Sequence, residues 1–137
     1  MVASPLPSGP EGLIERFGIG KRSSTAVTHN GTGYFAVTPQ APYDASVGVA
    51  EQTRQLLTKA EARLAEIGTD KSRLLFVAII LADMADYAEM NAVWDEWVAD
   101  VAPPSRACFN AALASPAMKV EMIMVSAVAD RFAAGDG

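Results

Sequence analysis

Cysteine, histidine and basic residues are all scarce in this chain of 137 residues. The single cysteine excludes an internal disulfide and suits a reducing compartment. No apolar run approaches the ~20 residues of a membrane span, and the N-terminus lacks the basic and then apolar segments of a secretory signal. We therefore expect a soluble, cytoplasmic protein that makes no use of a membrane.

The charge balance is acidic. Sixteen acidic residues against eleven basic ones give a net charge of −5 and a pI near 4.7. The longest basic cluster is Lys21-Arg22. Nucleic-acid binding needs a basic face that neutralises phosphates, so this balance disfavours nucleic acid as a partner.

Length and composition predict one domain. Half of the residues are apolar, which suffices for one core but not for two ordinary domains in a chain of this size. Residues 1–12 are rich in serine, proline and glycine, and residues 133–137 are equally poor in large apolar side chains, so neither stretch can fold alone. We expect an ordered domain over residues 13–132 between two loose tails.

The first half of the chain predicts a hairpin followed by a helix. Two strand-like stretches, residues 25–29 and 34–38, are separated by Asn30-Gly31-Thr32-Gly33, and Asn and Gly both tolerate the positive φ of a tight turn. Residues 49–67 place apolar side chains at helical spacing. Gly68 is positioned to end that helix in the left-handed conformation.

The unbroken apolar run of residues 74–81 predicts a central strand covered on both faces. Asp83 can cap a second helix, which Pro103-Pro104 ends, with Asp86 in its first turn. The apolar stripe of this second helix comprises Tyr87, Asn91, Trp94, Val98 and Val101. Asn91 is polar and needs hydrogen-bond partners, which we expect to be backbone carbonyls near a strand end. The alternative is that Asn91 has a role in a pocket.

The fold class follows from the order of these elements. Residues 107–113 and 119–128 are strand-like, and we interpret Pro116 between them as the turn of a hairpin. Strands and helices in this order predict an α+β fold, with one mostly antiparallel sheet and both helices on a single face. Another copy of the chain is the simplest cover for the other face, so we expect a homo-oligomer.

Two charged residues near the C-terminus form the main candidate site. Arg106 lies at the start of one predicted strand, where the preceding Pro103-Pro104 restricts the backbone. Glu121 lies inside the apolar run 120–128. A guanidinium with a fixed stem can present two parallel donors to a substrate carboxylate. A carboxylate in an apolar strand must find a partner or shift its pKa. The alternative is that Arg106 and Glu121 pair only with each other or with the backbone.

Other candidate residues have plainer interpretations. A catalytic Cys108 would need His29, but no motif couples the two, so we expect Cys108 to line a pocket or the core. We expect His29, beside the Asn30-Gly31 turn, to be an ordinary hairpin residue, because metal sites need several ligands. Trp94 and Trp97 are expected to serve the helix core and partner contacts.

Six short segments of the chain carry a family pattern. They are Glu51-Gln52-Thr53, Leu64-Ala65-Glu66-Ile67-Gly68-Thr69-Asp70-Lys71-Ser72, Leu81-Ala82-Asp83-Met84-Ala85-Asp86-Tyr87, Met90-Asn91-Ala92-Val93-Trp94, Pro104-Ser105-Arg106-Ala107-Cys108 and Lys119-Val120-Glu121. Any one of these segments alone is weak evidence for a family. In this order and at these spacings they resemble the Rid (RidA/YjgF) family of imine and enamine deaminases, and within it the YoaB-like branch. The resemblance runs from about residue 25 to residue 129.

The resemblance implies a chorismate-mutase-like fold assembled as a homotrimer, with active sites in clefts between neighbouring subunits. It also implies hydrolysis of a 2-imino acid, formed from an enamine, to ammonia and a 2-oxo acid without a cofactor or a metal. Arg106 would bind the substrate carboxylate, Glu121 would orient the attacking water or relay a proton, and Cys108 would line the pocket. Imine hydrolysis is intrinsically easy, so holding the carboxylate and placing one water can supply most of the acceleration.

The chain departs from the family pattern at two places. Ser23 aligns where many members carry an aromatic hydroxyl in a Gly-Pro-Tyr pattern. Val37-Thr38-Pro39-Gln40 stands where the family usually has Ser-Gly-Gln, so Thr38 adds bulk where glycine would let backbone approach the ligand, and Pro39 removes a donor. Ser23 and Thr38 are therefore expected to be altered walls of the substrate pocket, with an unusual substrate or weak catalysis as the result.

Two other functions remain open from the sequence. One is a non-catalytic trimer that uses Arg106 to hold a small carboxylate metabolite. The other is an endoribonuclease or translation inhibitor, activities that the family name has sometimes carried, and the acidic composition disfavours it.

Overall fold

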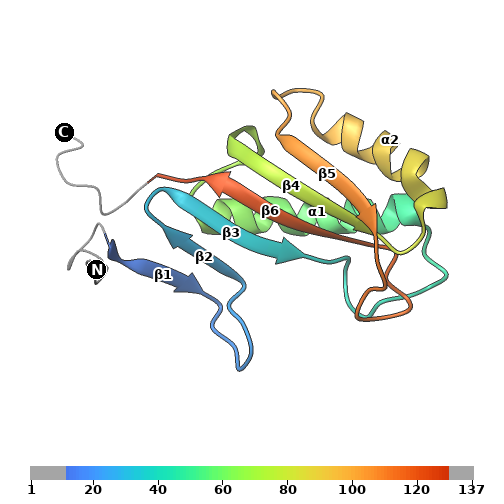
Figure 1. Ribbon diagram of the computed structural model, residues 1–137, viewed down its shortest axis with the longest axis horizontal. Helices are drawn as coiled ribbons and strands as arrows, with labels where there is room; N and C mark the ends of the chain where they lie inside the picture. The colour runs from blue at the N-terminus through green and yellow to red at the C-terminus, as the bar shows by residue number, and fades with distance from the viewer. Residues whose placement is uncertain (1–11, 130–137) are drawn as a thin grey trace, which may run out of the picture.

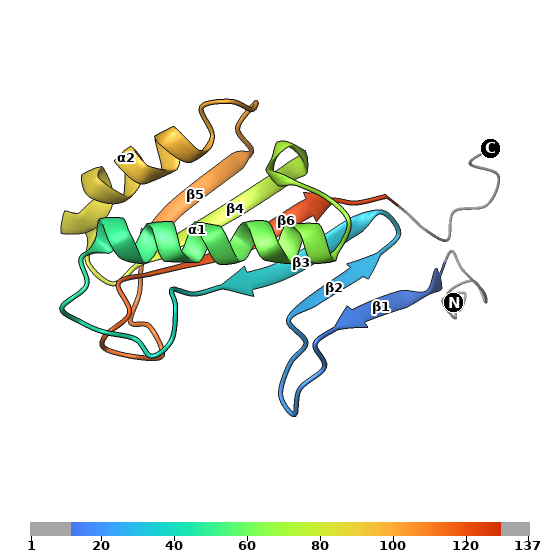
Figure 2. The same cartoon turned by 180° about the vertical axis from the view of Figure 1, so that it is seen from behind.

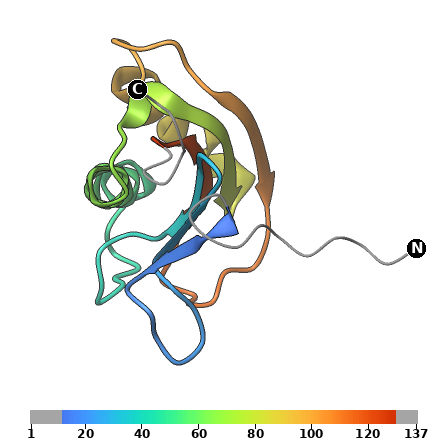
Figure 3. The same cartoon turned by 90° about the vertical axis from the view of Figure 1, so that its left-hand side faces the viewer.

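Six strands form one mixed sheet in the order β1-β2-β3-β6-β4-β5, as the computed structural model of residues 12–129 shows (Figure 1). Among these residues every neighbouring pair is antiparallel except β4 and β5. Both helices lie on one face of the sheet (Figure 3), which confirms the predicted arrangement. The tails expected at residues 1–12 and 133–137 lie outside the described residues, apart from residue 12.

The first three strands form a meander. Strand β2 (Ala26–His29) and β3 (Thr32–Val37) are joined by Asn30 and Gly31, whose φ angles of 48° and 81° are the positive values that the sequence predicted for this turn. Strand β1 (Ile14–Phe17) pairs with β2 and was missed by the sequence interpretation. Its four residues are too few, and Glu15 and Arg16 too polar, to stand out as a strand.

Helix α1 (Val49–Glu66) packs its apolar face across the sheet (Figure 2). Leu56, Ala60 and Leu64 are completely or almost completely buried, and Gly68 has a φ of 81° just beyond the helix, as the sequence predicted. The side-chain amide of Gln52 is also buried. Its nitrogen contacts the carbonyls of Asp44, Val47 and Ala117, and its oxygen accepts from the backbone N–H of Lys119 at 2.8 Å. Gln52 therefore ties two long loops to the helix.

Strand β4 (Leu74–Leu81) lies inside the sheet, as predicted, and leads into the second helix. The side chain of Asp83 accepts from the N–H of Ala85 at 2.9 Å, but it caps a 3-10 turn, η3 (Met84–Asp86), that precedes the α-helix. Helix α2 (Tyr87–Trp97) ends well before Pro103 and buries Met90, Val93 and Trp94. The expected stripe is thus only partly correct, because Tyr87 stays 41% exposed and the last turns are not helical.

The expected hairpin between the last two strands is wrong. Strand β5 (Ser105–Asn110) pairs parallel with β4 at the edge of the sheet, whereas β6 (Val120–Ala127) lies between β3 and β4. The burial of the strands explains this placement: Val120, Met122 and Met124 are fully buried beneath the helices, while β5 has no fully buried side chain. The more apolar strand takes the interior position, where both of its edges are paired.

The face of the sheet away from the helices is covered by no other helix or strand of residues 12–129 (Figure 3). Tyr34, Phe76, Phe109 and Ile123 lie on this face and expose between 36% and 48% of their surface, although Ala78 and Ile80 between them are nearly buried. We call the four exposed residues the open-face cluster. Such a surface on an isolated chain is typical of an interface. None of the helices among residues 12–129 has the length and apolar character needed to cross a bilayer.

Candidate functional site

Arg106 is held against helix α2 by three contacts. Its Cα is paired with that of Val77, so its side chain lies on the helix-bearing face of the sheet. Its Nη1 atom donates to Oδ1 of Asn91 at 2.8 Å, and Nη2 donates to the hydroxyl of Tyr87 at 3.4 Å. The guanidinium carbon also lies 5.6 Å from the centre of the Trp94 ring, a cation–π contact. The guanidinium is thus oriented without a carboxylate partner among the described residues.

These contacts correct the role expected of Asn91. Its side chain is half-buried, and its oxygen accepts from the Arg106 side chain, whereas backbone carbonyls near a strand end were the expected partners. The spacing of Tyr87, Asn91 and Trp94 places all three on one side of α2 facing β5. The sequence did contain this signal, because the three residues were assigned to one stripe, but it did not reveal that the stripe meets Arg106.

Cys108 lies on the same face as Arg106, two residues further along β5. It is half-buried beside the core. Burial raises the pKa of its thiol, and the nearby positive charge of Arg106 lowers the pKa only in part. A thiol with a raised pKa is a poor nucleophile, which agrees with the expectation that Cys108 lines a site rather than reacts.

Glu121 lies on the opposite face of the sheet from Arg106. Its Cα is paired with that of Ile80, which alternates with Val77 across the pleat. Its side chain is half-buried, and no hydrogen bond or ion pair to the carboxylate occurs within residues 12–129. Arg106 and Glu121 of one chain therefore do not meet, which excludes the alternative that they pair with each other within a chain.

Ser23 and Thr38 line one pocket of about 290 Å³, together with Lys59 and Arg63 from α1. The Thr38 hydroxyl lies 2.9 Å from the Tyr43 hydroxyl and accepts from Nζ of Lys59 at 3.3 Å. Thr38 directly follows Val37, whose pairing partner Met122 directly follows Glu121. The chain thus brings Ser23 and Thr38 together and places Glu121 at the same end of the β3–β6 pair. Lys59 and Arg63 were not identified from the sequence.

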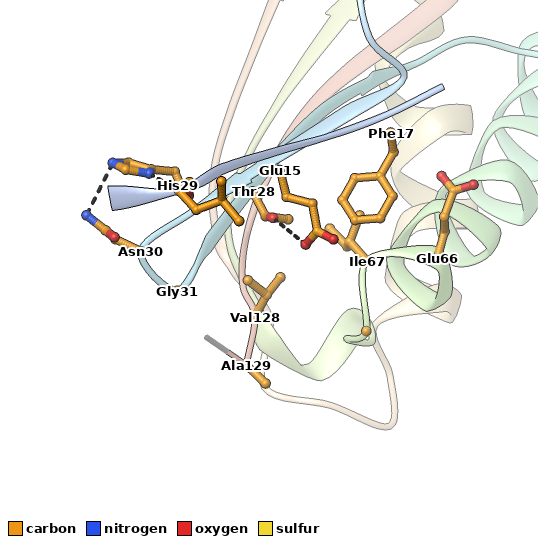
Figure 4. A pocket seen from close by; sticks show the side chains of 12 residues that line it. Glu15, Phe17, Thr28, His29, Asn30, Gly31, Glu66, Ile67, Val128 and Ala129 are labelled. Carbon is orange, nitrogen blue, oxygen red and sulfur yellow. Dashed lines mark hydrogen bonds between the residues drawn. The ribbon is translucent and has the colours of Figure 1, made fainter. Parts of the chain in front are cut away.

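His29 lies at a small cavity between the β1–β2 strands and the end of α1, shown in Figure 4. Its Nδ1 is 3.2 Å from the Leu13 carbonyl, and its Nε2 is 3.2 Å from the Asn30 side-chain nitrogen. One contact is to the residue directly before the neighbouring strand and the other is to the turn, as expected of an ordinary hairpin residue. Within the described part of the chain, no three His, Cys, Asp or Glu side chains are close enough to hold a metal ion.

Comparison with known proteins identifies the family. Residues 17–128 match the family described as Endoribonuclease L-PSP. A RutC family protein of Haemophilus ducreyi is 44% identical over 116 residues, which are 85% of this chain and 97% of that protein. The chain belongs to the Rid (YjgF/RutC) family. The RutC family protein YoaB of Escherichia coli is 37% identical over 115 residues, covering 84% of this chain and 98% of YoaB.

The fold agrees with a solved Rid-family structure. The crystal structure of NMB1025, a member of the YjgF family from Neisseria meningitidis, matches with a TM-score of 0.79 at 41% identity, over 86% of this chain and 97% of that one. The six sequence segments therefore indicated the Rid family correctly, including its similarity to YoaB.

Proposed function

We propose that the protein is a hydrolytic deaminase of 2-imino acids and their enamine tautomers. The observation that carries this proposal is the Arg106 guanidinium, fixed by Asn91, Tyr87 and Trp94 and not neutralised by any carboxylate of the described chain. A planar fork held in this way is suited to bind a substrate carboxylate through two parallel hydrogen bonds. Membership of the Rid family supports the same chemistry.

The reaction requires one water and no change of oxidation state. The water oxygen adds to the C=N carbon of the protonated imine while Glu121 takes up one water proton, which gives a neutral carbinolamine. The carbinolamine nitrogen then takes up the proton from Glu121 as the C–N bond breaks, and the hydroxyl proton passes to the released ammonia as the C=O bond forms, so that an ammonium ion and a 2-oxo acid are the products. Arg106 contributes by binding the carboxylate next to the reacting carbon, and this contact holds the carbon in a fixed orientation toward the water. Cys108 forms part of the wall beside Arg106.

The position of Glu121 supports a site shared between subunits. Arg106 and Cys108 lie on the helix-bearing face, whereas Glu121 lies on the other face near the end of the sheet that carries Thr38. We propose that a neighbouring copy supplies the second half, so that Arg106 of one subunit and Glu121 of the next act on one substrate. The open-face cluster would be buried in the same assembly, which we propose to be a homotrimer.

The proposal is tested by supplying imines directly. An amino-acid oxidase generates 2-imino acids in situ, and semicarbazide traps those that have not been hydrolysed. We expect the wild-type protein to lower the semicarbazone yield and to accelerate ammonia release. Arg106→Lys should lose at least about tenfold in kcat/KM, because lysine offers one compact charge instead of a planar fork. Glu121→Gln should retain binding of 2-oxobutyrate but lose turnover, because the amide cannot accept a proton.

Each outcome of this assay is informative. Wild-type protein that binds 2-oxobutyrate but does not accelerate ammonia release would be a carboxylate-binding protein and not an enzyme. Undiminished imine hydrolysis by Arg106→Lys would overturn the assignment of the site.

A further inference from the structure

The pocket that holds Ser23 and Thr38 is lined by hydroxyl groups and basic side chains. It lies between the loop before β2, the end of β3 and one side of α1, and its volume is about 290 Å³. Three consecutive hydroxyl residues, 23–25, form one wall, and Thr38 adds a fourth hydroxyl. Among the residues of 12–129 that line it, the charged ones are two cations, Lys59 and Arg63. A purely cationic pocket is unexpected on a chain with a net charge of −5.

The two cations lie one turn apart on α1 and are poorly neutralised. Nζ of Lys59 donates to the Thr38 hydroxyl at 3.3 Å and to the Pro39 carbonyl at 3.2 Å, and both acceptors are uncharged. Nη1 of Arg63 lies 3.8 Å from the Glu66 carboxylate, which does not line this pocket. Lys71, in contrast, is 3.1 Å from the Asp100 carboxylate. Partial burial and the charge of Arg63 lower the pKa of Lys59, so a bound anion would relieve an unfavourable arrangement.

The backbone next to these side chains is also available to a ligand. Strand β2 pairs with β3 only as far as Tyr34, whereas β3 continues to Val37. Among residues 12–129, no strand therefore pairs with the last part of β3, beyond Tyr34, on the edge that faces residues 23–25. Hydroxyls, a strand edge and two cations together match the needs of a compact anion with several acceptor oxygens.

We propose that this pocket binds a small anionic group, a phosphate or a carboxylate, through Lys59 and Arg63. The group belongs either to a free metabolite or to the distal end of a substrate whose first carboxylate is bound by Arg106. The second possibility rests on the proposed deaminase function, and the first does not. In that second case the preferred substrates are imines of dicarboxylic amino acids.

Inorganic phosphate and two 2-oxo acids serve as probes. Isotope-labelled full-length protein is titrated with phosphate at constant ionic strength, and the amide signals of residues 23–25 and Thr38 are followed by NMR. We expect saturable shifts at these amides, about tenfold weaker binding in Lys59→Gln and in Arg63→Gln, and retained binding in Lys59→Arg. Arg54→Gln is the matched control, because Arg54 is an exposed cation on the same helix outside this pocket.

A comparison of 2-oxoglutarate with 2-oxobutyrate separates the two sources of the anion. A site for the distal group of a substrate predicts tighter binding of 2-oxoglutarate, with a preference that disappears in Lys59→Gln. A site for a free metabolite predicts phosphate binding without that preference. The inference is overturned if neither phosphate nor 2-oxoglutarate shows binding that depends on Lys59, or if Arg54→Gln weakens binding equally. Arg106→Lys should leave phosphate binding unchanged, so failure of the deaminase proposal is recognised separately.

Discussion

The Nη1 atom of Arg106 donates a hydrogen bond of 2.8 Å to Oδ1 of Asn91, which connects the edge strand β5 to helix α2. We expect this bond to orient the guanidinium for a substrate carboxylate. Asn91→Ala should therefore raise KM for a 2-imino acid about fivefold to tenfold, a loss of the size of one ordinary hydrogen bond because water can partly replace the amide, with little change in kcat.

Stability distinguishes this role of Asn91 from a structural one. Arg106 is only half-buried, so water can replace the lost amide, and we expect the melting temperature of Asn91→Ala to stay close to that of the wild type. The exposed Glu89→Ala on the same helix is the control. A variant that melts early but keeps its KM would show that Asn91 anchors the helix instead.

Gln52 should contribute strongly to stability. Its buried amide contacts three carbonyls and one backbone N–H of two loops, and leucine would leave those groups without partners. We expect Gln52→Leu to lower the free energy of unfolding by about 2–3 kcal/mol in urea titrations. Gln55→Leu, which removes a single bond to the N–H of Gln40, is the matched control and should cost much less. Equal losses in the two variants would contradict this role.

Cys108 should react slowly with alkylating agents. Burial raises the pKa of its thiol, so a smaller fraction is thiolate at neutral pH than in the unfolded chain. We expect iodoacetamide to modify the native protein more slowly than the same protein in urea, and the native rate to keep rising at pH values where the unfolded rate has levelled off. Cys108→Ser should retain most of the deaminase activity. Rapid native alkylation together with an inactive serine variant would point to a nucleophilic thiol.

The open-face cluster should hold the assembly together. Ile123 is 43% exposed at the centre of this face, where a charge would be placed against apolar partner atoms. We expect Ile123→Lys to convert the proposed trimer into monomers, as measured by light scattering at micromolar concentration. Leu13→Lys, a change at a similarly exposed leucine outside the cluster, should not alter the mass. A wild-type mass close to one chain would contradict the trimer.

Local signals in the sequence predicted the elements that depend on local chemistry. The Asn30-Gly31 turn needs positive φ, and the end of α1 needs the left-handed Gly68, so both could be located from residue type. The pairing of the last two strands could not, because strand order depends on how much apolar surface each strand buries against distant helices. Pro116 was therefore mistaken for a hairpin turn.

The residues of the candidate site could also be recognised from the sequence, whereas their positions relative to one another could not. Arg106 and Glu121 were recognisable from the sequence as charged residues beside apolar stretches. The face of the sheet on which each side chain lies depends on the register of β5 and β6 against β4. A shift of one residue in either strand would reverse the face. The pocket cations Lys59 and Arg63 are an ordinary pair on a polar helix side until the fold places hydroxyls around them.

Complementation between two inactive variants tests the shared site most directly. Co-expressed Arg106→Lys and Glu121→Gln chains should form mixed trimers in which some interfaces combine an intact Arg106 with an intact Glu121. Random assembly of equal amounts makes about one quarter of the sites complete in a cyclic trimer, so imine hydrolysis should recover to about one quarter of the wild-type rate. Each variant alone should stay nearly inactive. No recovery in mixed trimers of confirmed composition would mean that both residues act within one chain, which would contradict the account.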